Sequence, residues 1–128
     1  MSTDESTRSP RETLQNERRA LVLAAEDVIT KRFKRGRLTK PNKTQFSNLI
    51  GLCNEAACAE EIVNYLRYQA GRNEWEREFA LSVIEGIRPI VSRLPDVPAV
   101  HCDAWKLYAT YLTRAYVYSN AITMGRSS

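Results

Sequence analysis

The residues with the clearest chemistry are closely spaced cations in the N-terminal third of the chain. Residues 31–43 include seven basic side chains and no acidic one: Lys31, Arg32, Lys34, Arg35, Arg37, Lys40 and Lys43. Residues 1–43 hold eleven Lys and Arg against six Asp and Glu, whereas residues 44–128 hold eight against nine. Clustered cations attract polyanions, of which nucleic acid is the commonest. This distribution favours one directional anion-binding surface over a uniformly basic protein.

A basic segment of this kind can bind phosphates without reading bases, because Lys and Arg neutralise backbone charge and release counterions. The plainer alternative is that these side chains serve solubility and stabilise a helix C-terminus. Gly36 and Pro41 interrupt the segment, which predicts a flexible contact rather than a rigid groove-reading element. Arg67 and Arg72, near the end of a later predicted helix, complete the set of candidate phosphate contacts.

Residues for catalysis or metal binding are sparse. The single histidine, His101, is adjacent to Cys102, so their side chains diverge. Cys53, Cys58 and Cys102 do not have the spacing of a zinc site, and the glycines are too scattered for a phosphate-binding loop. We therefore expect no enzymatic activity, no catalytic residue, no metal and no cofactor.

The three cysteines and the first residues indicate the compartment. An odd number of cysteines without a paired framework fits a reducing cytoplasm, in which thiols act as small core residues. The start of the chain lacks the features of a secretory signal, and no apolar run approaches the length of a membrane span. We expect a cytoplasmic protein without membrane contact.

The elements that must position these residues are helices. Apolar residues recur at helical spacing, and sustained alternation is absent, which predicts an all-α fold. We expect residues 1–10 to form a disordered tail and residues 11–128 a single helical domain. Helices are predicted over about 11–35, 43–59 and 60–71, from residue 73 onward, and over about 103–122. No Gly or Pro divides the second from the third, so one continuous helix over 43–71 is also compatible with the sequence.

Particular residues indicate where these helices begin and bend. Thr39 or Asn42 is predicted to cap the second helix, and Asn73 with Glu76 is predicted to form a capping box for the fourth. Pro89 predicts a kink or a restart near residues 86–89. Two apolar seams on the last helix indicate deep burial, or one core face and one partner face. Its tyrosines could stack on bases, although aromatics at helical spacing are more often core residues.

Three segments together carry a family resemblance. The first is a Leu-Thr turn leading into an amphipathic helix (residues 38–50), the second is a helix ending in Tyr-x-Ala-Gly-Arg (residues 65–72), and the third is an aromatic-rich last helix (residues 105–118). In this order and spacing they resemble the small subunit of type III CRISPR–Cas effector complexes, closest to the Csm-complex small subunit. The resemblance covers roughly residues 38–120.

The resemblance implies a non-catalytic bundle of about five helices that functions in antiviral defence. Its partners would be guide RNA and target RNA, the backbone and large subunits of the effector complex, and copies of itself stacked into an inner filament. A positive face would follow the guide–target duplex without sequence preference, since base pairing supplies specificity. Arg72 matches the last residue of the Ala-Gly-Arg signature, and Lys43 lies where the family also has cations.

Two other functions are compatible with the residues. A helical DNA-binding regulator would use a helix pair joined by a short turn, with a recognition helix facing solvent. The candidate turn, residues 37–42, is long for that role. A helical adaptor would have no nucleic-acid role at all.

Overall fold

The computed structural model describes the backbone of residues 9–127 and the side chains of residues 9–124. The described residues form six helices and no strand: α2 (Pro10–Asn16), α3 (Arg18–Phe33), α4 (Lys43–Glu55), α5 (Ala59–Gly71), α6 (Arg77–Ser92) and α7 (Pro98–Ser127). The prediction of an all-α bundle is confirmed. None of these helices is long and apolar enough to cross a bilayer.

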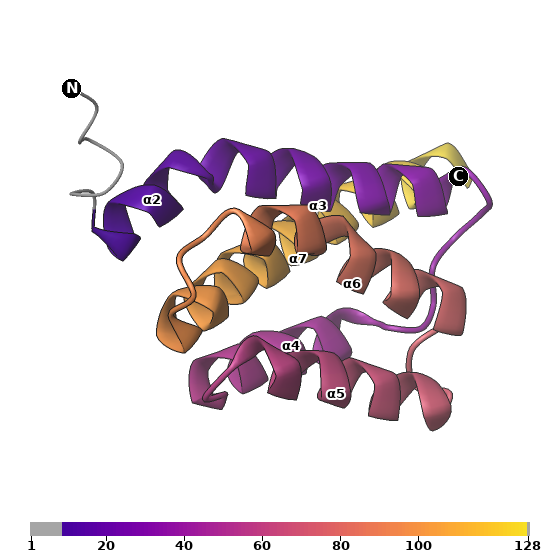
Figure 1. The fold of residues 1–128 in the computed structure, drawn as a ribbon. Coiled ribbons are helices and arrows are strands. Elements are labelled where there is room, and N and C mark those ends of the chain that lie inside the picture. The colour runs from indigo at the N-terminus through magenta and orange to yellow at the C-terminus, as the bar shows by residue number, and fades with distance from the viewer. Residues whose placement is uncertain (1–8, 128) are drawn as a thin grey trace.

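The bundle is built around its last helix. Helix α7 contacts each of the other five helices. In Figure 1, α2 and α3 run end to end along the top, α4 and α5 form a pair at the bottom, and α6 lies between these layers in front of α7. A helix with neighbours on several sides must be apolar on several faces, which explains the two apolar seams of the last helix.

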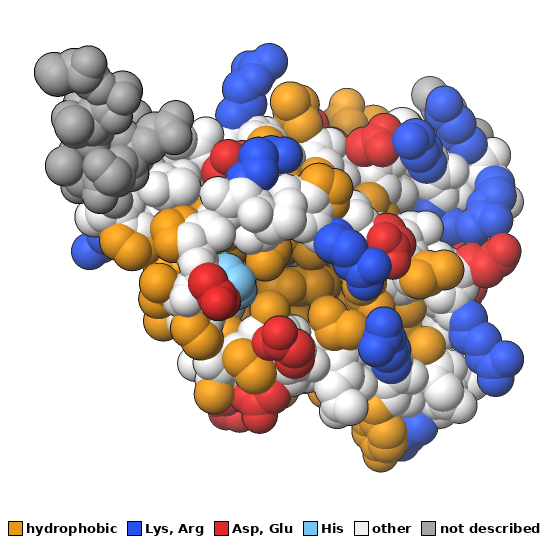
Figure 2. Space-filling model, viewed as in Figure 1, with side chains coloured by type: hydrophobic (Ala, Val, Ile, Leu, Met, Phe, Trp, Pro, Cys, Tyr) orange, Lys and Arg blue, Asp and Glu red, His pale blue; other side chains and the backbone are white. Residues whose placement is uncertain are grey.

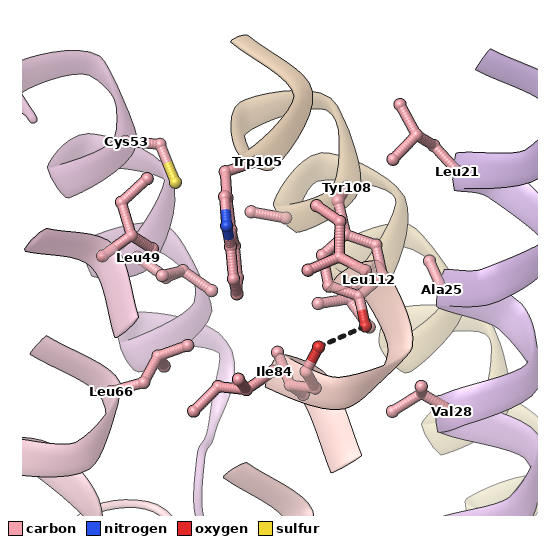
Figure 3. Packing of buried hydrophobic residues seen from close by; sticks show 14 of the residues in the cluster. Leu21, Ala25, Val28, Leu49, Cys53, Leu66, Ile84, Trp105, Tyr108 and Leu112 are labelled. Carbon is pink, nitrogen blue, oxygen red and sulfur yellow. Dashed lines mark hydrogen bonds between the residues drawn. The ribbon is translucent and has the colours of Figure 1, made fainter. Parts of the chain in front are cut away.

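The core is one continuous cluster that converges on α7. Figure 3 shows α7 side chains, among them Trp105, Tyr108 and Leu112, facing side chains from α3, α4, α5 and α6. All three are at most 1% exposed. The buried Tyr108 hydroxyl donates a 2.7 Å hydrogen bond to the carbonyl of Val83, so its polar group is satisfied inside the core. This seam of the last helix is therefore a core face.

Helices α6, α3 and α7 approach one another closely at Gly86. A Cβ atom on Gly86 would lie 2.7 Å from the Tyr108 hydroxyl oxygen and 2.9 Å from a methyl carbon of Val28. Both distances are shorter than van der Waals contact, so a side chain at this position requires Tyr108 or Val28 to move. Glycine is therefore required here for packing.

The N-terminal region differs from the predicted helix over 11–35. Residues 1–8 of the predicted tail lie outside the described residues, whereas Ser9 caps α2 in a capping box with Glu12, and Pro10 is its first residue. The predicted helix is divided at Glu17 into α2 and α3. No Gly or Pro marks the division in the sequence; the Glu17 carboxylate is held by Arg93, at 2.7 Å and 3.1 Å.

Two of the predicted helix starts hold, and one is wrong. Asn42 caps α4, in a capping box with Gln45. Helix α5 is separate from α4 because residues 56–58 leave the helical conformation, although no Gly or Pro divides them. Asn73 does not cap the fourth helix, because it has a left-handed φ of 66° and α6 begins only at Arg77.

The last two helices differ from their predicted course. Helix α6 continues through Pro89 to Ser92, so the predicted restart does not occur, although Pro89 has no N–H to donate to the Glu85 carbonyl four residues earlier. Helix α7 begins at Pro98 rather than at Asp103. Proline suits the first position of a helix, since its missing N–H would have no intrahelical partner there.

Candidate nucleic-acid interface

The basic segment, defined as residues 31–43, lies at one end of the bundle. It comprises the last turn of α3, the connection to α4 and the first residue of α4. Gly36, with a φ of 118°, lets the chain turn after α3. Figure 2 shows Lys and Arg side chains gathered at the right-hand end of the molecule, where Figure 1 places the end of α3 and the start of α6. The fold therefore presents this charge in one direction.

Arg32 differs from the other cations because its side chain is only 12% exposed. It forms a two-pronged ion pair with Glu76, with Nε–Oε1 and Nη2–Oε2 distances of 2.7 Å and 2.8 Å. It also donates to the carbonyls of Gly36 and Arg37, at 2.8 Å and 3.4 Å. The backbone N–H of Glu76 donates to the Lys40 carbonyl at 2.9 Å. Arg32 and Glu76 therefore hold the connection between α3 and α4 in place.

The charge of Glu76 reflects this contact. The hydrogen bond from Arg32 holds the pKa of the Glu76 carboxyl below its ordinary value of 4.5. The nearby positive charges of Arg32 and Arg35 act in the same direction, while partial burial opposes them. Glu76 is thus an anion at neutral pH, and it neutralises the positive charge of Arg32.

Lys31, Arg35 and Arg37 have partners that a ligand could replace. Lys31 pairs with Asp27 at 3.0 Å, and Arg35 lies 3.8 Å from Glu76 and 3.6 Å from Glu78. Arg37 donates to the amide oxygen of Asn120 on α7 at 3.3 Å. Exposed ion pairs contribute little to stability, about 0–1 kcal/mol, because water and salt screen them. These cations can exchange their present partners for phosphate at small cost.

Three lysines of the segment have no acidic partner. Lys34, Lys40 and Lys43 are exposed, and none of them forms an ion pair with any of residues 9–124. Lys43 is moreover the first residue of α4, where the helix dipole disfavours a cation. These three lysines offer the most available positive charge in the segment.

Arg67 on α5 and Arg72, the C-cap residue of α5, have different surroundings. Arg67 is on the rim of a groove of about 360 Å³ between α5 and α6, whose floor includes Ile87 and Trp105. Figure 2 shows a hollow with an apolar floor at the centre of this face. Arg72 lies over the ring of Tyr68, 5.4 Å from its centroid, and donates to its hydroxyl at 3.3 Å. Because about 100° separates successive helical residues, Arg67 and Arg72 do not share a helix face.

The groups that surround the cations were not evident from the sequence. Glu76 and Glu78 form ion pairs with Arg32 and Arg35. Their spacing in the sequence gives no sign of this, since more than forty positions separate the two groups. Tyr118 on α7 is 68% exposed, although aromatic residues at helical spacing are more often core residues.

The cysteines and the histidine show no arrangement for chemistry. Cys53 and Cys102 are buried, and burial raises the pKa of the Cys53 thiol to about 12, so it is not a thiolate at neutral pH. His101 Nε2 lies 2.9 Å from the Pro95 carbonyl. Among residues 9–127, no group of three or more His, Cys, Asp or Glu side chains could hold a metal ion.

No protein-family model, no curated protein and no solved structure matches this chain. The family resemblance therefore rests on the three sequence segments alone.

Proposed function

We propose that this protein is a non-catalytic, RNA-binding small subunit of a type III CRISPR–Cas effector complex, closest to the Csm-complex small subunit. It would act in the cytoplasm, in antiviral defence. The observation that carries the proposal is the end of the bundle at which Lys34, Lys40 and Lys43 are exposed without acidic partners. The resemblance to this family is carried by segments 38–50, 65–72 and 105–118, in this order along the chain.

In this proposal the cations contact the phosphates of target RNA paired with its guide. Lysine ammonium groups bind phosphate as point charges, which suits a surface that must accept any sequence. Sequence specificity comes from base pairing between guide and target. Each copy would supply part of a positive stripe continued by neighbouring copies and by the backbone subunits.

The test is a charge reversal of the three unpaired lysines. We expect the triple variant Lys34→Glu, Lys40→Glu, Lys43→Glu to bind single-stranded RNA on the order of 100-fold more weakly at 0.1 M salt. Loss of three phosphate contacts also lowers the slope of log affinity against log salt by about 2. Fluorescence anisotropy of a labelled RNA strand over a range of salt concentrations measures both quantities.

A matched control separates this surface from net charge alone. The variant Arg11→Glu, Arg19→Glu, Lys106→Glu makes the same change in charge at exposed residues remote in sequence from the basic segment. It is expected to keep most of the affinity. Equal losses in the two variants would contradict the assignment, and tighter binding of duplex DNA than of RNA would favour a DNA-binding regulator.

A further inference from the structure

A second groove lies between α3 and α7, and none of the candidate phosphate contacts lines it. Its volume is about 470 Å³, within the range of about 300–1,000 Å³ typical of ligand sites. One wall carries Val22, Glu26 and Thr30 of α3, and the other carries Tyr111, Arg114 and Tyr118 of α7. Ala115 lies between the α7 side chains, and its small size leaves the groove open.

The α7 wall presents flat surfaces to the groove. Tyr111 and Tyr118 are two helical turns apart on one face of α7, a rise of about 10.5 Å. Arg114 comes between them in the sequence, and its guanidinium carbon lies 6.0 Å from the centroid of the Tyr111 ring. Tyr118 is 68% exposed, although tyrosine rings usually gain from burial. Aromatic rings and guanidinium planes are the groups on which single-stranded nucleic acids stack their bases.

The remaining groups in the groove suit the edge of a base. Glu26 and Thr30 are exposed on the α3 wall and offer a carboxylate acceptor and a hydroxyl. From the start of α3, Arg18 donates to the hydroxyl of Tyr111 on the other wall at 3.3 Å and so helps to fix that ring. The groove thus combines stacking surfaces with hydrogen-bonding groups.

The groove is continuous with the basic segment. Thr30, which lines the groove, is one helical turn before Lys34, the C-cap residue of α3. At the other wall, Ser119 borders Asn120, which accepts the hydrogen bond from Arg37. A strand whose phosphates contact Lys34 and Arg37 would therefore pass the rim of the groove that Tyr118 lines.

We propose that the α3–α7 groove binds one base of the RNA at a position that is not paired with the guide, while the basic segment holds the neighbouring phosphates. This inference rests on the proposed RNA-binding function and adds a base-stacking site to it. Stacking tolerates any sequence, because every base has an aromatic face. The groove would therefore distinguish a strand that has bases from one that lacks them, without preferring one base.

The test compares two strands on the full chain: an unstructured oligouridylate of about 12 nucleotides and an abasic ribose-phosphate strand of the same length. The wild-type protein is expected to bind the intact strand about fivefold or more tightly than the abasic strand. Tyr118→Ala removes this difference, whereas Tyr118→Trp keeps it. A 2-aminopurine placed in the intact strand reports stacking directly, through quenching of its fluorescence.

The controls address folding and specificity. Tyr118 is mostly exposed, so its replacement should leave the thermal unfolding curve unchanged. Leu81→Ala truncates another exposed apolar side chain, on α6 and outside the groove, and is expected to leave the discrimination intact. The triple lysine variant is expected to bind both strands more weakly by the same factor, because it removes phosphate contacts alone.

Each other outcome overturns a definite part of the inference. If the wild-type protein binds both strands equally, the base site is wrong while phosphate binding stands. If it binds neither strand, the proposed function fails and the base site fails with it. If Tyr118→Ala changes only the oligomeric state in sedimentation experiments, the groove is occupied by a second copy of the chain and not by a base.

Discussion

Among the individual side chains, Arg32 shows how one basic residue can have a structural role inside a binding segment. Its neighbours in the sequence are exposed cations, yet it is mostly buried against Glu76 and two carbonyl groups. A charged group that satisfies several partners cannot also neutralise a phosphate without leaving them unpaired. We therefore separate Arg32 from the cations available to RNA.

Replacing Arg32 should lower stability more than replacing its exposed neighbours. We expect Arg32→Ala to cost about 1–2 kcal/mol of unfolding free energy, because Glu76 and the Gly36 carbonyl lose charge-assisted hydrogen bonds. Lys34→Ala is expected to change stability by less than about 0.5 kcal/mol. Urea unfolding followed by circular dichroism measures both values, and equal effects would contradict a structural role for Arg32.

The same ion pair predicts how stability depends on pH. Hydrogen bonds from arginine hold the pKa of Glu76 and of Glu17 below the ordinary value of 4.5, through Arg32 and Arg93 respectively. The stability that this provides is present above pH 4.5 and is lost as the pH falls through the lowered folded-state values. Melting temperatures measured from neutral pH to about pH 3 should therefore fall less steeply for Glu76→Gln than for the wild type.

Glu17→Gln provides an independent version of this experiment, because Glu17 pairs with Arg93 and not with Arg32. A double variant is expected to flatten the acid limb further than either single variant. Parallel acid limbs for all four proteins would show that other carboxylates govern acid stability.

Among the helices, the approach of α6 to α7 and α3 makes a sharp prediction about glycine. Gly86→Ala would place a Cβ atom 2.7 Å from the Tyr108 hydroxyl oxygen, which is fixed by its bond to Val83. We expect a loss of about 1–3 kcal/mol from overpacking, which outweighs the gain of about 0.5–1 kcal/mol in helix propensity.

Gly51→Ala is the matched control, since Gly51 also lies inside a helix but has open space around its Cβ position. It should stabilise the protein by about 0.5–1 kcal/mol, because only the propensity term acts there. Chemical denaturation of the two variants compares the signs directly. Stabilisation by Gly86→Ala would show that the three helices can separate without cost.

The helices also show which features of the sequence are sufficient to predict where an element begins or what it buries. Asn42 could be predicted as a cap because its partner Gln45 is only three residues away. The core face of α7 could be predicted because its apolar residues recur at helical spacing. The division at Glu17 and the late start of α6 could not be predicted. Arg93 reaches the Glu17 carboxylate, and Arg32 the Glu76 carboxylate, only in the folded bundle. Local patterns carry local structure, whereas these boundaries depend on contacts between distant segments.

The candidate site follows the same division. The concentration of cations was readable from composition, and the fold places it at one end of the bundle. The sequence does not show which cations are free to bind phosphate, because α4 and α5 separate Arg32 and Arg35 from their acidic partners along the chain. Exposure of Lys34, Lys40 and Lys43 emerges only when those pairs are known.

For the bundle taken together, the separation of charge predicts fast, salt-sensitive association. The cations of residues 31–43 lie at one end of the bundle, while residues 44–128 hold slightly more acids than bases. Such a field orients an approaching polyanion and raises its association rate at low ionic strength. Stopped-flow fluorescence should show the triple lysine variant slowed mainly in association at low salt, with the difference shrinking as salt rises. A change confined to dissociation would argue against steering by this end of the molecule.

The hydrogen bonds from Arg32 to Gly36 and Arg37, with the bond from Glu76 to Lys40, have a consequence for the thermodynamics of binding. They fix the backbone that presents the cations, so the conformational entropy of ordering this connection is lost during folding and not upon contact with a ligand. Isothermal titration calorimetry should therefore give a less unfavourable binding entropy for the wild type than for Arg32→Ala. A connection that looks like a flexible linker in the sequence would then act as a preorganised surface.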